Sequence, residues 1–110
     1  MTTSTPLRAV QFLDATDRDD AQAALACLAP DAVVIDDGRT YEGDAIAAWL
    51  ERSASEYEYT RDFRGLEPLG ASTYVARYRL EGNFPGGVVD LRYLFTLAAD
   101  GRVARLEITV

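Results

Sequence analysis

Alternation of apolar and polar residues is most regular in the C-terminal third of the chain, between Leu80 and Leu97. The segment Asn-Phe-Pro-Gly-Gly at 83–87 interrupts this alternation, which then resumes. A period of two predicts β-strands, and a break rich in glycine and proline predicts a tight turn. We therefore expect two long antiparallel strands joined by a hairpin. The rest of the chain is expected to cover one face of their sheet.

Helical spacing of apolar residues is found upstream. Thr5 can cap free amides and Pro6 suits a first helical turn, which predicts a helix over Pro6–Ala15 with one apolar stripe. The stripe comprises Leu7, Val10, Phe12 and Leu13. A second helix, capped by Asp17 and closed by Pro30, is predicted over Arg18–Leu28. A third helix is predicted over Ala45–Ser53, with Ile46, Trp49 and Leu50 on one face.

The remaining segments predict strands. A short β-branched run gives a strand over Asp31–Asp36, and Asp36–Arg39 turns the chain out of it. Four further strands are expected over Glu56–Gly70, Thr73–Phe84, Val88–Ala98 and Arg102–Val110. This order predicts a single α+β domain over residues 1–110, in which three N-terminal helices cover the concave face of a curved, cone-shaped antiparallel sheet.

The two faces of the long strands differ in character. Alternation places aromatic residues such as Tyr93 and Phe95 on the side toward the helices. The opposite side carries Arg77, Arg79, Asp90 and Arg92. These charges can form cross-strand pairs or a polar dimer interface.

The composition is that of an ordinary globular domain, with 48% hydrophobic and 26% charged residues. A net charge of -7 argues against a nucleic-acid backbone or an anionic membrane as partner, because both bind basic faces. The apolar runs are too short to cross a bilayer and the N-terminus does not resemble a signal peptide, so we expect a cytoplasmic protein. The single cysteine, Cys27, is interpreted as a small buried thiol rather than a nucleophile.

Several classes of chemistry are excluded because the sequence contains neither histidine nor lysine. Nucleophiles activated by histidine, the commonest zinc sites, Schiff bases and Walker-type phosphate loops all need one of these residues. General acid or base catalysis would fall to a carboxylate or a tyrosine. Asp36 and Asp37 are adjacent and point to opposite sides of a strand, so we expect no metal site and no cofactor.

Three segments then carry a resemblance to a known superfamily. They are Ala-Pro-Asp-Ala-Val-Val-Ile-Asp-Asp at 29–37, Tyr-Glu-Gly-Asp-Ala-Ile-Ala-Ala-Trp-Leu at 41–50 and Gly-Asn-Phe-Pro-Gly-Gly at 82–87. With the order of elements, they resemble the nuclear-transport-factor-2-like superfamily and its SnoaL-like domains over nearly the whole chain. The resemblance implies a cone closed by helices over a pocket, usually in a homodimer built on the outer sheet face. Members include ketosteroid isomerases, polyketide cyclases, epoxide hydrolases and non-catalytic binding modules.

The resemblance also implies positions for catalytic residues. The isomerase branch has an aspartate base at the end of the first strand, and Asp36 lies at the matching position. Its oxyanion-donating tyrosine is matched by Phe12, and its second, protonated aspartate is matched by Tyr93. A phenol can donate a hydrogen bond to a developing enolate, so Tyr93 is a candidate donor beside the candidate base Asp36. The alternative is that Asp36 caps the turn after its strand and Tyr93 fills the core.

Aromatic residues form the expected lining of a pocket. They are Phe12, Trp49, Tyr57, Tyr59, Tyr74 and Tyr78. An apolar cavity with a few polar tips suits a small hydrophobic or aromatic ligand, whereas the same side chains packed tightly would fill the cone. Arg61 and Arg64 can neutralise an acidic ligand, although solvated arginines are expected on a long strand. Asp90 and Arg92 invite comparison with the epoxide-hydrolase branch but are predicted to lie on the outer face.

Two functional hypotheses follow from these observations. In the first, the chain binds a small hydrophobic carbonyl compound and acts as an isomerase or cyclase, with Asp36 as base and Tyr93 as donor. In the second, the chain is a non-catalytic dimeric module whose pocket is filled or vestigial, and whose role lies in protein association.

Overall fold

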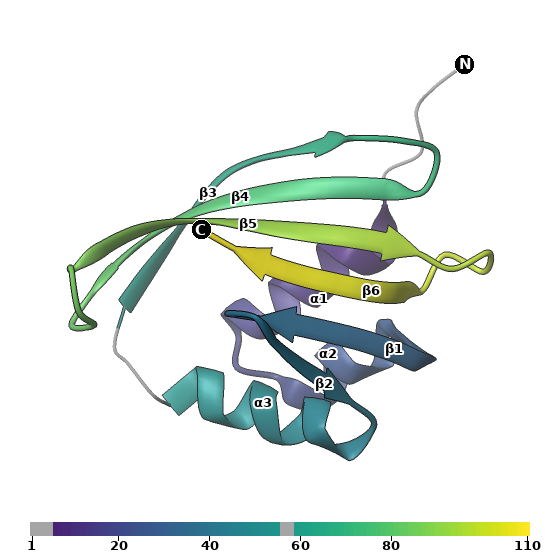
Figure 1. The fold of residues 1–110 in the computed structure, drawn as a ribbon, viewed down its shortest axis with the longest axis horizontal. Helices are drawn as coiled ribbons and strands as arrows, with labels where there is room; N and C mark the ends of the chain where they lie inside the picture. The colour runs from purple at the N-terminus through teal and green to yellow at the C-terminus, as the bar shows by residue number, and fades with distance from the viewer. Residues whose placement is uncertain (1–5, 56–58) are drawn as a thin grey trace.

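The computed structural model describes residues 6–55 and 59–110. It contains a curved, unclosed sheet of six strands with three helices packed against it (Figure 1). The helices are α1 (Leu7–Asp17), α2 (Ala21–Ala26) and α3 (Asp44–Ser55). The strands are β1 (Leu28–Asp36), β2 (Arg39–Glu42), β3 (Tyr59–Pro68), β4 (Thr73–Gly82), β5 (Val88–Leu97) and β6 (Val103–Thr109). The predicted α+β class is confirmed.

The strand order is β2-β1-β6-β5-β4-β3. All neighbouring strands are antiparallel except β1 and β6, which are parallel, so the sheet is mixed rather than purely antiparallel. Figure 1 shows β3, β4 and β5 bending together at one end, while α3 runs beside the β1–β2 hairpin.

Helix α1 packs on the sheet with a face that differs in part from the predicted stripe. Phe12 and Leu13 are buried, as expected, but Leu7 and Val10 are 58% and 38% exposed. The small residues Ala9 and Ala15 are fully buried in their place. They let the helix backbone approach the sheet closely, so the contact face rotates toward them.

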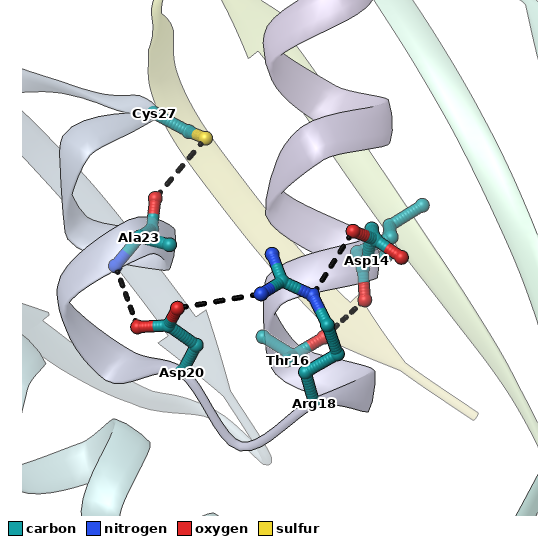
Figure 2. Close-up of polar contacts among 7 residues, drawn as sticks. Asp14, Thr16, Arg18, Asp20, Ala23 and Cys27 are labelled. Atoms are coloured by element: carbon teal, nitrogen blue, oxygen red, sulfur yellow. Dashed lines mark hydrogen bonds and ion pairs between the residues drawn. The ribbon is translucent and has the colours of Figure 1, made fainter.

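The corner between α1 and α2 is stabilised by a different cap from the one predicted (Figure 2). Asp20, not Asp17, is the N-cap of α2, and its carboxylate accepts a hydrogen bond from the backbone N–H of Ala23 at 3.1 Å. The Arg18 guanidinium contacts both Asp14 and Asp20, which ties the last turn of α1 to this cap. The helix predicted over Arg18–Leu28 is therefore shorter at both ends.

The C-terminal end of α2 is set by the sheet. The carbonyl oxygen of Cys27 accepts from the N–H of Val103 at 2.9 Å, and Leu28 is already paired with Val103 in the ladder. This pairing starts β1 three residues before the predicted Asp31. Pro30 is tolerated because the β1–β6 register shifts between Leu28 and Val33.

Strand β2 was not predicted. Its four residues pair with the end of β1 through a tight turn in which Asp37 and Gly38 both have positive φ, 53° and 76°. Two central residues with positive φ are the signature of the hairpin turn that Asp-Gly favours. The segment read as a simple turn thus continues into a short edge strand.

The long strands follow the predicted pattern of faces. Tyr93 and Phe95 are buried, whereas Arg77, Asp90 and Arg92 are exposed on the other side. Phe95 meets Phe12 of α1 edge to face, with ring centroids 6.0 Å apart. The largest fully buried side chains are Phe12, Phe95, Leu106, Val34 and Val103. The core therefore lies between α1 and the central strands, and it leaves the bent strand ends free to enclose a cavity.

Candidate functional site

A cavity of about 790 Å³ lies between the helices and the bent end of the sheet. Its wall draws on α1, α2, α3 and every strand except β2. The apolar and aromatic part of the wall comprises Phe12, Ala21, Ala24, Trp49, Leu50, Tyr59, Leu80, Phe84, Pro85, Val89, Leu91, Tyr93, Ile108 and Val110. The remaining lining residues are Thr16, Asp19, Asp20, Asp36, Asp37, Gly38, Glu51, Arg61 and Thr109. Such a volume, largely apolar with a few polar groups, is of the size that accommodates small organic ligands.

Asp36 reaches this cavity from the last residue of β1. Its backbone pairs with Arg39 in β2 and with Ile108 in β6, which fixes the direction of the side chain. The carboxylate oxygen Oδ2 accepts a hydrogen bond from the indole Nε1–H of Trp49 at 2.9 Å. Within the described part of the chain no second hydrogen bond to this carboxylate is seen. One oxygen is therefore anchored while the other is open to a ligand.

Trp49 is positioned by α3 so that its ring lines the cavity and its N–H meets Asp36. The side chain is only 5% exposed. On its other side the ring of Tyr41 lies 6.0 Å away, and the Tyr41 hydroxyl accepts from Arg52 of the same helix at 3.1 Å. Trp49 therefore acts as a wall of the cavity and also orients the carboxylate.

Tyr93 lines the cavity from β5, and its side chain is 9% exposed. The phenolic oxygen accepts a hydrogen bond from Nη2 of Arg61 at 3.4 Å. Burial raises the pKa of Tyr93 to about 12, against a smaller opposing effect of the Arg61 charge. The hydroxyl is therefore protonated at neutral pH, and it can donate its hydrogen.

Arg61 is a lining residue that the sequence led us to expect in solvent. Its side chain is 10% exposed, and the guanidinium lies 4.4 Å from the ring centroid of Tyr78 and 5.5 Å from that of Tyr93. Nη1 donates to the Thr16 hydroxyl and pairs with Asp17, both at 2.9 Å. Alternation from Tyr59 places Arg61 on the aromatic side of β3. This alternation is the sequence signal that indicates a buried Arg61. Arg64, in contrast, is exposed as expected.

The other predicted pocket residues are distributed differently. Phe12 and Tyr59 line the cavity, and Tyr59 packs edge to face on Phe84 with centroids 6.5 Å apart. Tyr74 and Tyr78 are buried but do not line the cavity. Tyr78 lies one layer behind, against Arg61 and Tyr93. Tyr57 lies outside the described residues.

Carboxylates gather at the cavity in addition to Asp36. They are Asp19, Asp20, Asp37 and Glu51. Within residues 6–55 and 59–110, no group of three or more potential ligands is arranged to hold a metal ion. Asp90 and Arg92 lie on the outer face of the sheet, away from this cavity. Cys27 donates to the carbonyl of Ala23, and burial raises the pKa of its thiol.

The fold and the cavity together define a helix-capped α+β cone with an anchored carboxylate and a buried tyrosine inside. A SnoaL-like domain matches residues 9–106, so the chain belongs to the SnoaL-like family. The resemblance to the nuclear-transport-factor-2-like superfamily is thereby confirmed. No curated protein sequence matches the chain. In the described part of the chain, no helix has the length and apolarity needed to cross a membrane.

Solved structures show the same architecture. A protein from Sinorhizobium meliloti that has been assigned as a polyketide cyclase is 35% identical, with a TM-score of 0.86 over 96% of this chain and 95% of that one. A protein from Mycobacterium tuberculosis, solved in complex with estradiol-17β-hemisuccinate, is 16% identical, with a TM-score of 0.79 over 97% of this chain and 95% of that one. At this identity the second likeness shows the fold alone.

Proposed function

We propose that the chain binds a small hydrophobic carbonyl compound in the cavity and moves a proton on it, as an isomerase or cyclase does. The observation that carries this proposal is that the walls of one largely apolar cavity include both Asp36 and Tyr93, each held by a donor from another element. A carboxylate with one free oxygen is a suitable base, and a protonated phenol is a suitable hydrogen-bond donor.

The proposed mechanism assigns one role to each group. The free oxygen of Asp36 takes the proton from the carbon next to the substrate carbonyl, and the electron pair of the broken C–H bond moves onto the carbonyl oxygen as an enolate. The Tyr93 hydroxyl donates a hydrogen bond to that oxygen and stabilises the negative charge as it forms. In a substrate with a C=C bond next to the deprotonated carbon, the carbonyl then re-forms, the double bond shifts, and the electron pair takes the proton back from Asp36 at the far carbon of the original C=C bond, which completes an isomerisation. In a cyclase the enolate carbon would instead attack a second carbonyl carbon as the first carbonyl re-forms, and the oxygen of the second carbonyl would take the proton from Asp36.

Two relatives support this choice of substrate. The Sinorhizobium protein, 35% identical, has been assigned to the polyketide cyclases. The Mycobacterium protein of the same fold was solved with a steroid derivative. Both are consistent with a largely apolar cavity whose polar groups include Asp36, Tyr93 and Arg61.

Proton exchange tests the proposal directly. Cyclic ketones and β-diketones incubated with the protein in deuterated water should exchange the hydrogen next to the carbonyl faster than in buffer, as followed by NMR. Asp36→Asn should lower this rate by about a hundredfold or more, because general-base catalysis is typically worth that much. Asp37→Asn is the matched control, since Asp37 is adjacent and also lines the cavity. Equal rates for wild type and Asp36→Asn would remove Asp36 as the base.

A second candidate function is a dimeric association module, favoured by the outer face of the sheet. Arg77 and Arg92 lie directly opposite each other in β4 and β5, and both are exposed. Like charges in opposed positions destabilise a sheet unless acidic groups neutralise them. Arg77 already pairs with Glu67 of β3, whereas Arg92 donates to the backbone carbonyl of Val110 and has no acidic partner among the described residues, so a second copy could supply one for Arg92. Sedimentation equilibrium should then show a dimer that Arg92→Glu weakens and the distant Arg18→Glu leaves intact. A monomer at all concentrations would exclude this function.

A further inference from the structure

Arg61 has a feature that its structural contacts do not explain. Among the described residues its Nε–H is the one buried side-chain donor or acceptor without a hydrogen-bond partner. An unsatisfied buried N–H on a charged group is costly, so part of the Arg61 charge is left uncompensated beside the cavity. Arg61 lines the cavity with 10% of its side chain exposed.

The hydrogen bond from Arg61 also determines the direction of the Tyr93 hydroxyl. A guanidinium can only donate, so in this pair the phenolic oxygen is the acceptor and its own hydrogen must be directed elsewhere. No acceptor for that hydrogen is seen in the described part of the chain. Because Tyr93 lines the cavity, an oxygen atom of a bound ligand would be the acceptor for the Tyr93 hydroxyl hydrogen.

We propose that Arg61 is a positioning and specificity-determining residue that makes the part of the cavity beside Tyr93 selective for ligands with an ionisable oxygen, such as phenols and enols, bound as their anions. Arg61 turns the Tyr93 hydroxyl toward the ligand and places a fixed positive charge beside the ligand oxygen. The inference rests on the proposed function only in that the cavity must admit a small molecule. It does not need Asp36 to act as a base.

The charges around Arg61 determine how strongly it attracts an anion. Asp17 of α1 pairs with Nη1 and neutralises part of the guanidinium charge, but Asp17 is 46% exposed and so is well screened. Tyr78, Tyr93 and Tyr59 lie on the sheet side, and burial raises the pKa of each further above its ordinary value, so they add no negative charge near pH 7. Five carboxylates line the same cavity and oppose the attraction of an anion, at Asp19, Asp20, Asp36, Asp37 and Glu51, and Trp49 holds one oxygen of Asp36.

A visible phenol distinguishes the ionised from the neutral ligand. 4-Nitrophenol ionises near neutrality and only its phenolate absorbs in the visible range, so equilibrium dialysis at several pH values gives the Kd of both forms. Wild type should bind the phenolate more tightly than the neutral phenol. Arg61→Gln should weaken phenolate binding about tenfold or more and neutral binding less than about threefold, because hydrogen bonds to charged groups are the stronger ones. Arg61→Lys, which keeps the charge, should recover part of the preference.

Asp17→Asn separates this role from a merely structural one. If Arg61 only supported the cavity wall, breaking the ion pair from either side would weaken both forms of the ligand alike. On our inference Asp17→Asn frees the Arg61 charge and should strengthen phenolate binding about threefold, the opposite direction to Arg61→Gln. Two results would overturn the inference. One is weaker binding of both the phenolate and the neutral phenol in both variants, and the other is equal affinity of the wild type for the two forms. Because 4-nitrophenol has no hydrogen beside a carbonyl, these outcomes are independent of the exchange experiment that tests Asp36.

Discussion

Asp36 and Tyr93 come from different strands, and each is oriented by a donor that is distant in sequence. Trp49 of α3 holds the carboxylate, and Arg61 of β3 holds the phenol. Both donors are themselves buried among aromatic rings, which restricts their rotamers. Fixing functional groups in this way reduces the reorganisation that would otherwise be needed when a ligand binds.

Replacement of Trp49 by phenylalanine tests the first of these pairs. Trp49→Phe keeps an aromatic wall but removes the donor to Asp36, so the free energy of unfolding should fall by about 1 to 3 kcal/mol. Urea denaturation followed by circular dichroism measures this change. In the Asp36→Asn background the same substitution should cost less, because the charged acceptor is already absent. Equal costs in both backgrounds would show that the hydrogen bond contributes nothing beyond packing.

Alkaline pH tests the burial of Tyr93. Its pKa is raised from 10.0 to about 12, so between these pH values the unfolded chain has released a proton that the folded chain retains. Stability is therefore complete below pH 10 and falls as pH rises toward 12, by about 3 kcal/mol for this group. Urea denaturation across this range should show a shallower fall for Tyr93→Phe than for wild type. Identical slopes would mean that Tyr93 is accessible to water.

The sequence located some cavity residues and missed others for identifiable reasons. Asp36 and Tyr93 were placed by strand alternation and by resemblance, and both do line the cavity. The residue type predicts Arg61 in solvent because arginine is usually exposed, yet the strand period set by Tyr59 places its side chain inward. At this position the strand period is a better guide to burial than the residue type. The unsatisfied Nε–H and the neutralising Asp17 depend on how α1 meets β3, which no local pattern encodes.

At the scale of single elements, the cap of α2 has a measurable role. Asp20→Ala removes the acceptor for the Ala23 N–H and one of the two partners of Arg18, so it should destabilise the chain by about 1 kcal/mol. Gln22→Ala, an exposed change within the same helix, should cost much less. Thermal unfolding of the two variants gives the comparison. A larger loss in Gln22→Ala would contradict the assignment of Asp20 as the cap.

Elements with strong periodicity were predicted within a few residues, and weakly patterned ones were not. Strands β4 and β5 begin at Thr73 and Val88, as expected, because alternation over ten residues leaves one register that buries Tyr93 and Phe95. Strand β2 has only Tyr41 to indicate a buried side, so the alternation over its four residues is too short to predict a strand. Helix α2 was overextended because Leu28 satisfies a helical pattern as well as a strand, and pairing with Val103 decides between them.

At the scale of the whole molecule, charge controls access to the cavity. The net charge is -7, and four carboxylates besides Asp36 line the cavity, at Asp19, Asp20, Asp37 and Glu51. An anionic ligand is therefore repelled on approach, although Arg61 attracts it once inside. A neutral acid that enters and then ionises avoids this barrier.

Salt dependence measures that barrier. Raising ionic strength from about 0.01 M to 0.15 M shortens the Debye length from about 30 Å to 8 Å, so the association rate constant of 4-nitrophenolate should rise several-fold. The rate constant of the neutral phenol at lower pH is the control and should barely change. Stopped-flow quenching of Trp49, the one tryptophan in the sequence, provides the signal. A phenolate rate that falls with salt would mean that the approach is attractive.

The position of β6 has a consequence for how the chain reaches its native state. β6 is last in sequence, yet it lies between β1 and β5 in the sheet. Until residues 103–109 have been synthesised, the β1–β2 hairpin and the β3–β4–β5 meander share no strand partner, and each presents an unpaired edge. Contacts between segments so distant in sequence form late and slow folding. Assembly on the ribosome therefore awaits this final strand, and a nascent chain stalled before it would be a substrate for chaperones or for aggregation.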